Sequence, residues 1–183
     1  MSDTDAVTLR PATVEDADGI ARVRVQSWRV TYRGIFPDAF LDEMDVEEAA
    51  ADWERILMAP AGGTSVFVAE REGEVVAFAA GKMLDDEKFG INAELAAIYV
   101  RPSAKREGIG RRLLRMVADA HQGKGANGLL VWVLAKNEIA RQFFEDLGAE
   151  LLVEQPYVWD ELELVEAGYG WRDLDALIDA CGQ

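Results

Sequence analysis

The residues best suited to chemistry form one short basic segment around two glycines, Gly108 and Gly110. The basic side chains of this segment are Lys105, Arg106, Arg111, Arg112 and Arg115. They stand out because the formal net charge of the whole chain is -15. A helix that starts at glycines offers unpaired backbone N–H groups and the positive end of its dipole, and both bind phosphate. The segment therefore predicts a site for an anionic, phosphate-bearing ligand.

The glycine pair alone does not identify the phosphate compound. A dinucleotide-binding turn needs a third glycine at position 113, where this chain has Leu113. A nucleotide-triphosphate loop needs Gly-Lys-Ser/Thr, which the chain lacks. An ordinary strand-to-helix turn is the alternative that requires no ligand.

Length and composition limit the class of protein. The chain has 183 residues, half of them apolar, which predicts a single domain spanning residues 1–183. No run approaches the ~20 apolar residues that span a bilayer, and the polar, acidic start is unlike a signal peptide. We therefore expect a cytoplasmic protein with no membrane partner. One cysteine, Cys181, and one histidine, His121, allow no internal disulfide and predict no metal site.

The acidic net charge bears on the kind of partner. Affinity for a phosphate backbone comes from lysine and arginine, so a charge of -15 argues against nucleic-acid binding. The same charge mildly favours cationic partners. It is equally well explained as a surface that keeps the protein in solution.

The pattern along the chain predicts a mixed α/β fold that positions the glycine segment between a strand and a helix. A capping pattern, Thr13-Val-Glu-Asp16, precedes a first amphipathic helix, and residues 129–134 are apolar on both faces and are expected at the sheet centre. The expected strands are 8–10, 65–70, 74–80, 94–100, 129–134 and two within 151–169. The expected helices are 17–33, 37–58, 108–121, 137–147 and 171–180.

The glycine segment resembles the core motif of the GNAT superfamily of N-acetyltransferases. That motif reads Gln or Arg, two residues, Gly, one residue, and Gly or Ala, and Lys105, Gly108 and Gly110 fill these positions. Lys105 departs from Gln or Arg, but the superfamily uses this loop mainly through backbone donors. A second segment, 137–148, is similar to the family's Asn-x-x-Ala-x-x-Phe-Tyr motif with its trailing glycine. The resemblance covers roughly residues 7–150.

The resemblance implies a GNAT-like fold, with a central mixed, mostly antiparallel sheet flanked by helices, and acetyl-CoA as cosubstrate. The backbone of Ile98, Tyr99 and Val100 would pair with the pantetheine arm, as an added strand pairs with a sheet edge. Asn137 would hold the arm from the other side, and it fits equally well as a helix N-cap. The residues implied in the coenzyme-binding loop are Lys105, Arg106, Glu107, Gly108, Ile109, Gly110 and Arg111.

The reaction that the family carries out needs a base. An alkyl amine has a pKa of about 10.4, so deprotonation at neutral pH costs about 4.6 kcal/mol, and a positioned carboxylate can accept the proton. Glu94 is the candidate catalytic residue, because several family members carry a glutamate base on the same strand, eleven positions before the residue that aligns with Lys105. Its neighbours Leu95 and Ala96 favour partial burial. A solvated strand glutamate is the alternative.

The acid that would protonate the departing thiolate is less clear. Many family members have a tyrosine one residue after the position of Phe143, but here that residue is Phe144, which has no proton to give. The thiolate can leave unaided or receive a proton from water. The tyrosines that remain as candidates are Tyr99, Tyr157 and Tyr169.

The segment from Ser27 to Asp38 is expected to border the acceptor pocket. It resembles a Trp...Tyr-x-Gly-x-x-Pro signature of bacterial family members without an assigned substrate. Trp28 and Tyr32 are four residues apart and share a helix face, so they can form an aromatic wall beside an amine. The alternative is that both rings anchor the helix in the core.

The sequence leaves three functions open. The first is an N-acetyltransferase that acts on the primary amine of a small molecule. The second is a peptide or protein N-terminal acetyltransferase with an extended groove. The third is an acyl-CoA-binding module with weak catalysis, which the residue at position 144 keeps open. The acceptor and the oligomeric state, monomer or homodimer, are not identified.

Overall fold

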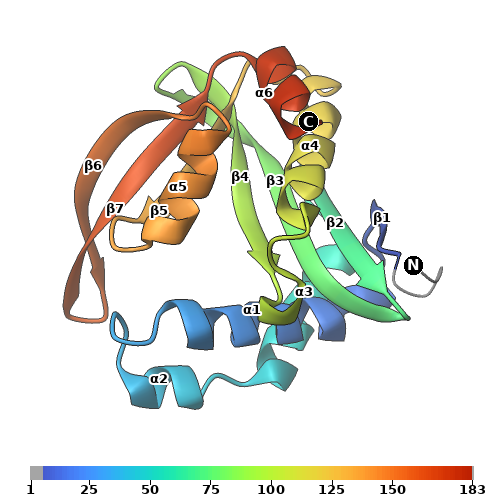
Figure 1. The fold of residues 1–183 in the computed structure, drawn as a ribbon, viewed down its shortest axis with the longest axis vertical. Helices are drawn as coiled ribbons and strands as arrows, with labels where there is room; N and C mark the ends of the chain where they lie inside the picture. Colours follow the sequence, from blue (N-terminus) through green and yellow to red (C-terminus); the bar gives the residue numbers. More distant parts are fainter. Residues whose placement is uncertain (1–5, 183) are drawn as a thin grey trace.

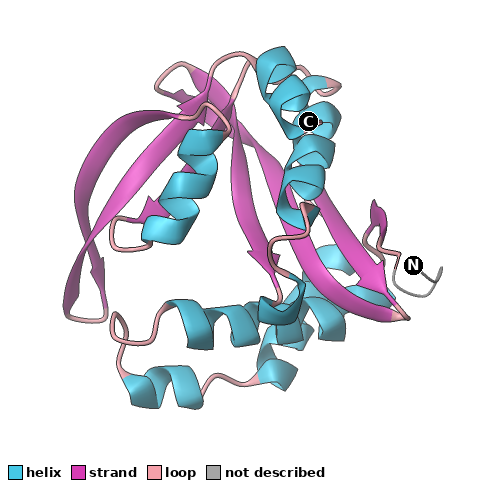
Figure 2. Cartoon of the chain, viewed as in Figure 1, coloured by secondary structure: helices cyan, strands magenta, loops and turns pink. Residues whose placement is uncertain are grey.

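The computed structural model describes residues 6–182, which form one sheet with helices packed against both of its faces (Figures 1 and 2). The predicted mixed α/β fold is confirmed. The single-domain prediction covers residues 1–183, of which 1–5 and 183 lie outside the described residues, and it stays a prediction.

The element bounds follow the sequence pattern, except that the strand predicted over 74–80 continues to Lys88. The strands are β1 (Thr8–Pro11), β2 (Thr64–Arg71), β3 (Glu74–Lys88), β4 (Ile91–Val100), β5 (Leu129–Leu134), β6 (Glu150–Trp159) and β7 (Leu162–Trp171). The α-helices are α1 (Ala17–Thr31), α2 (Asp38–Asp42), α3 (Val46–Met58), α4 (Ile109–Gln122), α5 (Glu138–Asp146) and α6 (Leu174–Cys181). Two 3₁₀ turns, η2 (Val14–Asp16) and η3 (Pro102–Ala104), precede α1 and α4.

The region expected to be one helix over residues 37–58 is two helices. The chain leaves helical geometry after α2, and Asp45 adopts an extended conformation, with its side chain accepting hydrogen bonds from the backbone N–H groups of Glu47 and Glu48. This N-cap starts α3 as a separate helix. The break bends the chain, so that α2 lies under the end of α1 while α3 runs back beside it (Figure 1).

The sheet has the order β1-β2-β3-β4-β5-β7-β6. Every neighbouring pair is antiparallel except β4 and β5, which are parallel. The prediction that residues 129–134 form the central strand is therefore wrong by one position, because β4 holds the centre and β5 lies next to it. The apolar character of β5 on both faces reflects its interior place in the sheet.

Two hydrophobic clusters fix the helices to opposite faces. The larger one lies between the sheet and α4, α5 and α6, and includes Leu113, Leu129 and Phe144. The smaller one lies between the other face and α1, and includes Ile20, Val23 and Phe78. The face beneath α1 and the face beneath α4 are thus distinct surfaces of the same strands.

Two irregularities of β4 matter for function. First, its register with β5 consists of one pair, Glu94 opposite Leu130, after which the two strands diverge toward α1 (Figure 1). Second, the register with β3 shifts between Ala80 and Gly81, which pair with Ala97 and Leu95, so that one residue of β4 forms a β-bulge. Within the described chain, residues 95–100 have a strand partner on the β3 side only.

Among residues 6–182, no helix is long and apolar enough to cross a membrane. The same residues contain no group of three or more histidine, cysteine, aspartate or glutamate side chains placed to hold a metal ion.

His121 of α4 is fully buried against β2 and β3. Its Nε2 lies 2.7 Å from Ser65 Oγ, and its Nδ1 lies 3.3 Å from Met83 Sδ. A Cβ at Gly81 would lie 2.6 Å from Nε2, so the glycine makes room for the ring. Burial, together with the nearby charge of Lys124, lowers the pKa of His121 below its ordinary value.

This lowered pKa predicts a loss of stability in mild acid. Below the unfolded-state pKa of about 6.5, the unfolded chain binds a proton that the folded chain resists, so the free energy of unfolding should fall as pH falls from 7 to 5. The slope should approach, at most, about 1.4 kcal/mol per pH unit. Urea titrations at several pH values should show that His121→Gln, which lacks the titrating ring, has a flatter profile. An equal slope in both proteins would assign the effect to other groups.

Candidate active site

The coenzyme-binding loop predicted from the sequence lies where β4 leads into α4. Gly108 caps α4 with φ +78°, a left-handed conformation that favours glycine, and no side chain caps the helix. A Cβ at Gly108 would meet nothing within 4 Å, so the space beside this backbone is open. The side chain of Ile109 is buried, which leaves only its backbone to face a ligand. The start of α4 therefore fits a phosphate group.

The second glycine has a different role from the one expected. A Cβ at Gly110 would lie 3.4 Å from the Phe143 ring and 3.7 Å from Val100, in ordinary van der Waals contact. Its missing side chain thus points toward α5 and the end of β4, and not into open space. The correction concerns direction only, because Gly110 still belongs to the first turn of α4.

The rest of the loop is exposed and tethered at one point. Lys105, Arg106 and Glu107 are all exposed, and Arg106 adopts φ +67° without being glycine. Glu107 Oε1 accepts a 2.7 Å hydrogen bond from Arg71 at the end of β2. This ion pair holds the loop against the β2–β3 turn.

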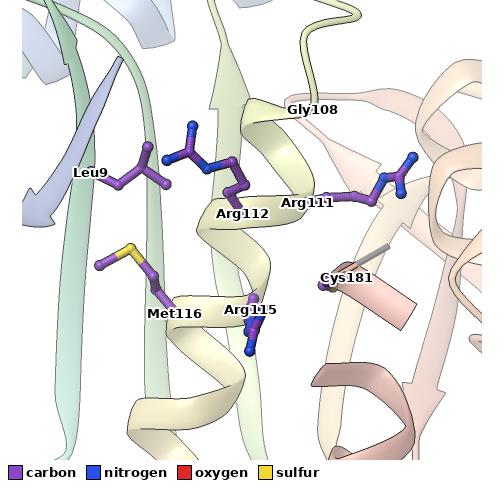
Figure 3. Close-up of a pocket in the computed structure, with 8 residues that line it drawn as sticks. Leu9, Gly108, Arg111, Arg112, Arg115, Met116 and Cys181 are labelled. Carbon is purple, nitrogen blue, oxygen red and sulfur yellow. The ribbon is translucent and has the colours of Figure 1, made fainter. Parts of the chain in front are cut away.

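The predicted basic cluster is a real surface feature. A cavity of about 540 Å³ lies on the outer side of α4, between β1 and α6, and is lined by Gly108 and three arginines, Arg111, Arg112 and Arg115. Figure 3 shows Arg112 extending toward Leu9 and Arg111 toward the end of α6. The helix start and the three guanidinium groups thus present positive charge on one side of an acidic protein.

Cys181 borders the same cavity but is not a nucleophile there. Burial raises the pKa of its thiol to about 11, although the arginines nearby act in the opposite direction. At neutral pH the side chain stays a thiol, which reacts poorly.

The three β4 residues expected to hold a pantetheine arm lie on the edge of β4 without a strand partner. Ile98 and Val100 pack against the larger core, while Tyr99 points to the α1 face. Asn137 lies at the start of α5, where its side chain accepts a hydrogen bond from the Ala140 N–H. The N-cap role of Asn137 is therefore present in the structure, and it leaves the other face of the amide available.

Glu94 lies on the α1 face of β4, next to Lys82. The residues on either side of Glu94, Ala93 and Leu95, belong to the core beneath α4. Because successive side chains of a strand point to opposite faces, Glu94 lies on the other face. The residue is 9% exposed, and Lys82 Nζ lies 3.2 Å from Oε2. The expected partial burial of Glu94 is present, and the carboxylate is held by a half-exposed cation.

The two residues expected to border the acceptor join a larger aromatic cluster. The Trp28 and Tyr32 rings lie 4.7 Å apart in an edge-on arrangement, and both contact Phe36. Phe36 in turn contacts Trp159 at the tip of the β6–β7 hairpin. Tyr32 is buried, as expected of a ring that anchors the helix in the core. Trp28 is half-buried, so part of its ring is available to border a pocket.

A chain of hydrogen bonds connects this cluster to the predicted coenzyme site. Trp28 Nε1 donates a 3.0 Å hydrogen bond to the Tyr99 hydroxyl. The Tyr32 hydroxyl lies near enough to Tyr99 and Asn137 for both to influence its pKa. Residues from α1, β4 and α5 that the sequence assigned to two separate sites are therefore in mutual contact.

The remaining acid candidates differ in how free their hydroxyls are. Phe144 is buried against Trp171, and Tyr169 behind it is fully buried, donates to Glu145 and accepts from Arg141. Tyr157 is exposed on β6. Burial raises the pKa of both Tyr32 and Tyr99 above the ordinary value, although hydrogen bonding to Trp28 partly offsets this for Tyr99.

Three features of the site were missed from the sequence. Lys82 contacts Glu94 because the strand register places them opposite each other, and no local pattern reveals this. The bulge at Ala96 depends on the same register. Arg24, whose guanidinium lies 4.9 Å from the centre of the Trp28 ring, is detectable only as the residue one helical turn before Trp28.

The comparisons with known proteins identify the family. The family model of the acetyltransferase (GNAT) family matches residues 25–149. YuaI of Bacillus subtilis (strain 168), an uncharacterized N-acetyltransferase, is 35% identical over 172 residues, covering 93% of this chain and 96% of that protein. Spermidine N(1)-acetyltransferase of Thermoplasma acidophilum is 22% identical over 163 residues, covering 83% of this chain and 98% of that protein.

A solved structure shows the same fold. YncA, an acetyltransferase from Salmonella typhimurium solved with acetyl-CoA, superimposes with a TM-score of 0.69 at 20% identity, covering 92% of this chain and 94% of that one. The family model matches most of the chain, and YuaI aligns with it almost from end to end. The chain therefore belongs to the acetyltransferase (GNAT) family and is an acyltransferase.

Proposed function

We propose that the protein transfers an acetyl group from acetyl-CoA to the primary amine of a small molecule, with Glu94 as the general base. The observation that carries the proposal is the position of this buried carboxylate. It lies on β4 immediately before the strand edge that has no β5 partner, on the face that α1 and its aromatic cluster border. A base, a binding edge and an acceptor wall thus meet along one strand.

The residues of the chain fit the coenzyme from end to end. The open start of α4 at Gly108 suits the pyrophosphate, and the free edge of β4 over residues 98–100 suits the amide groups of the pantetheine arm. Asn137 lies across from that edge at the start of α5. The structures of relatives with acetyl-CoA bound support this choice of cosubstrate.

Acetyl-CoA, when bound, supplies an acetyl group activated as a thioester. Glu94 accepts the proton that the amine loses as it attacks, directly or through a water. The amine nitrogen forms the new bond to the carbonyl carbon, and the bond to sulfur breaks. Lys82 orients the carboxylate, and its half-exposed position keeps a path open to the solvent for the proton.

The thiolate leaves without a tyrosine acid in this proposal. A thiol has a pKa near 8.5, so its anion needs only modest help. Burial weakens Tyr32 and Tyr99 as acids, which makes both poor proton donors to a thiolate. We assign these hydroxyls to the hydrogen-bonded wall between α1, β4 and α5, and protonation of the thiolate to water.

The two other functions considered from the sequence are tested by the same assay. Thiol release from acetyl-CoA across a panel of small amines and peptides separates a small-molecule enzyme from an N-terminal peptide acetyltransferase. An acyl-CoA-binding module without useful catalysis would bind acetyl-CoA and release no thiol with any acceptor.

Gly110 provides a test of the coenzyme site. Gly110→Asp adds a negative charge to the first turn of α4, between the proposed pyrophosphate position and the end of β4, and should weaken acetyl-CoA binding about 10- to 100-fold in calorimetry. The fold should survive, because an acidic residue is favourable in the first turn of a helix. Gly110→Ala is the matched control, since its Cβ makes only ordinary contact with Phe143. Equal affinities for the two variants would contradict the assignment.

Glu94 provides a test of the base. Glu94→Gln keeps the shape of the side chain and removes its basicity, so the turnover number at pH 7 should fall about 100- to 10,000-fold. The defect should shrink as pH rises, because more of the acceptor is already deprotonated. Acetyl-CoA affinity should be unchanged, and Glu87→Gln, at an exposed position of the neighbouring β3, should behave as wild type. Near-normal turnover of Glu94→Gln at pH 7 would leave water as the proton acceptor.

A further inference from the structure

Arg24 is a half-buried cation without an acidic partner in a strongly acidic protein. Arg10, Arg22 and Arg33 each pair with at least one carboxylate. Within residues 6–182 no carboxylate forms an ion pair with Arg24, and its recorded contact is with the face of the Trp28 ring, 4.9 Å from the ring centre. Such stacking holds a guanidinium in place while leaving its N–H groups at the edge able to bind an anion.

The groups around Arg24 are hydrogen-bond donors or neutral hydroxyls. Trp28 Nε1 donates to the Tyr99 hydroxyl, and Arg24 stacks on the same Trp28 ring, so the guanidinium and this hydroxyl are held by one side chain. Burial raises the pKa of Tyr99, and the positive charge of Arg24 acts in the opposite direction. A protonated phenol beside a guanidinium leaves the positive charge of Arg24 uncompensated.

This cluster lies beside the acetyl end of the proposed coenzyme site. The arm runs along residues 98–100 from the phosphate site at α4, so its acetyl end lies toward Glu94. Because of the bulge at Ala96, the side chains of Ala97 and Tyr99 point to the same α1 face as Glu94. An amine that approaches on this face therefore has the carboxylate of Glu94 on one side and the Arg24 cluster on the other.

We propose that the Arg24 guanidinium binds a carboxylate of the acceptor, so that the substrate is an amine that carries a carboxylate near its reacting nitrogen, as amino acids do. The inference rests on the proposed function and narrows it. An amine with a second positive charge, such as a polyamine, would place that charge against Arg24. The local charge of the acceptor wall is thus opposite to the net charge of the protein.

The test compares acceptors that differ only in the carboxylate. An amino acid, its carboxamide and the amine left after removal of the carboxylate, for example lysine, lysinamide and 1,5-diaminopentane, are assayed for thiol release from acetyl-CoA. Wild type should prefer the amino acid by kcat/KM. Arg24→Gln should reduce this preference about 10- to 100-fold, as expected for a lost charge-assisted hydrogen bond, while the KM for acetyl-CoA stays the same.

Two variants serve as controls. Arg22→Gln removes an exposed arginine of the same helix that pairs with Asp18, and it should leave the acceptor preference unchanged. Arg24→Lys keeps the charge but loses the planar fork, and it should retain part of the preference and a normal thermal midpoint.

Three outcomes would overturn the proposal, and a fourth would contradict the proposed function instead. A full preference for the carboxylate in Arg24→Gln would overturn it, and so would a wild-type preference for the carboxamide or the diamine. A shift in the KM for acetyl-CoA alone would assign Arg24 to the coenzyme and overturn the proposal as well. Absence of thiol release with every acceptor would instead contradict the proposed function, because the preference of Arg24 is measurable only when transfer occurs.

Discussion

The central strand of this sheet has backbone hydrogen-bonding groups that its neighbour does not satisfy, and the rest of the site depends on this constraint. β4 meets β5 at one register pair, Glu94 with Leu130, and then continues with one free edge toward α4. Residues 96–100 are partly exposed, so their unpaired N–H and C=O groups are accessible to an occupant that can pair like a strand. A linear chain of amides such as the pantetheine arm has that property.

The bulge at Ala96 determines which side chains accompany this edge. A regular strand would place Glu94 and Tyr99 on opposite faces, because their positions differ by an odd number. The extra residue at the bulge shifts the alternation by one position, so that both side chains lie on the α1 face. Leu95, Ile98 and Val100 still pack in the core beneath α4, so the apolar side chains lie on one face and Glu94 on the other.

The sequence was sufficient for features encoded by neighbouring residues. The capping pattern at Thr13, the helix start at Gly108 and the N-cap at Asn137 are local, and the structure contains all three. The direction in which a side chain at Gly110 would point is not a local property, because it depends on α5, which comes from a distant part of the chain.

Features that depend on strand register or on packing between distant elements could not be predicted, because they are determined by residues far apart in the sequence. Lys82 faces Glu94 only through the pairing of β3 with β4. The break before Asp45 divides a region that reads as one amphipathic helix, since helical spacing continues across it. The position of Arg24 over Trp28 follows from helical spacing, but its lack of an acidic partner depends on every element packed nearby.

The aromatic cluster around Phe36 has a consequence for how the protein folds. It joins the end of α1 to Trp159 and Leu162 in the last hairpin, so it connects segments separated by most of the chain. Contacts of such high sequence separation carry a large loop-closure cost and form late unless other structure brings the ends together. We therefore expect the sheet and its two larger hydrophobic clusters to assemble before this aromatic cluster closes, so that β4 and α4 are in place before α1 is joined to the last hairpin.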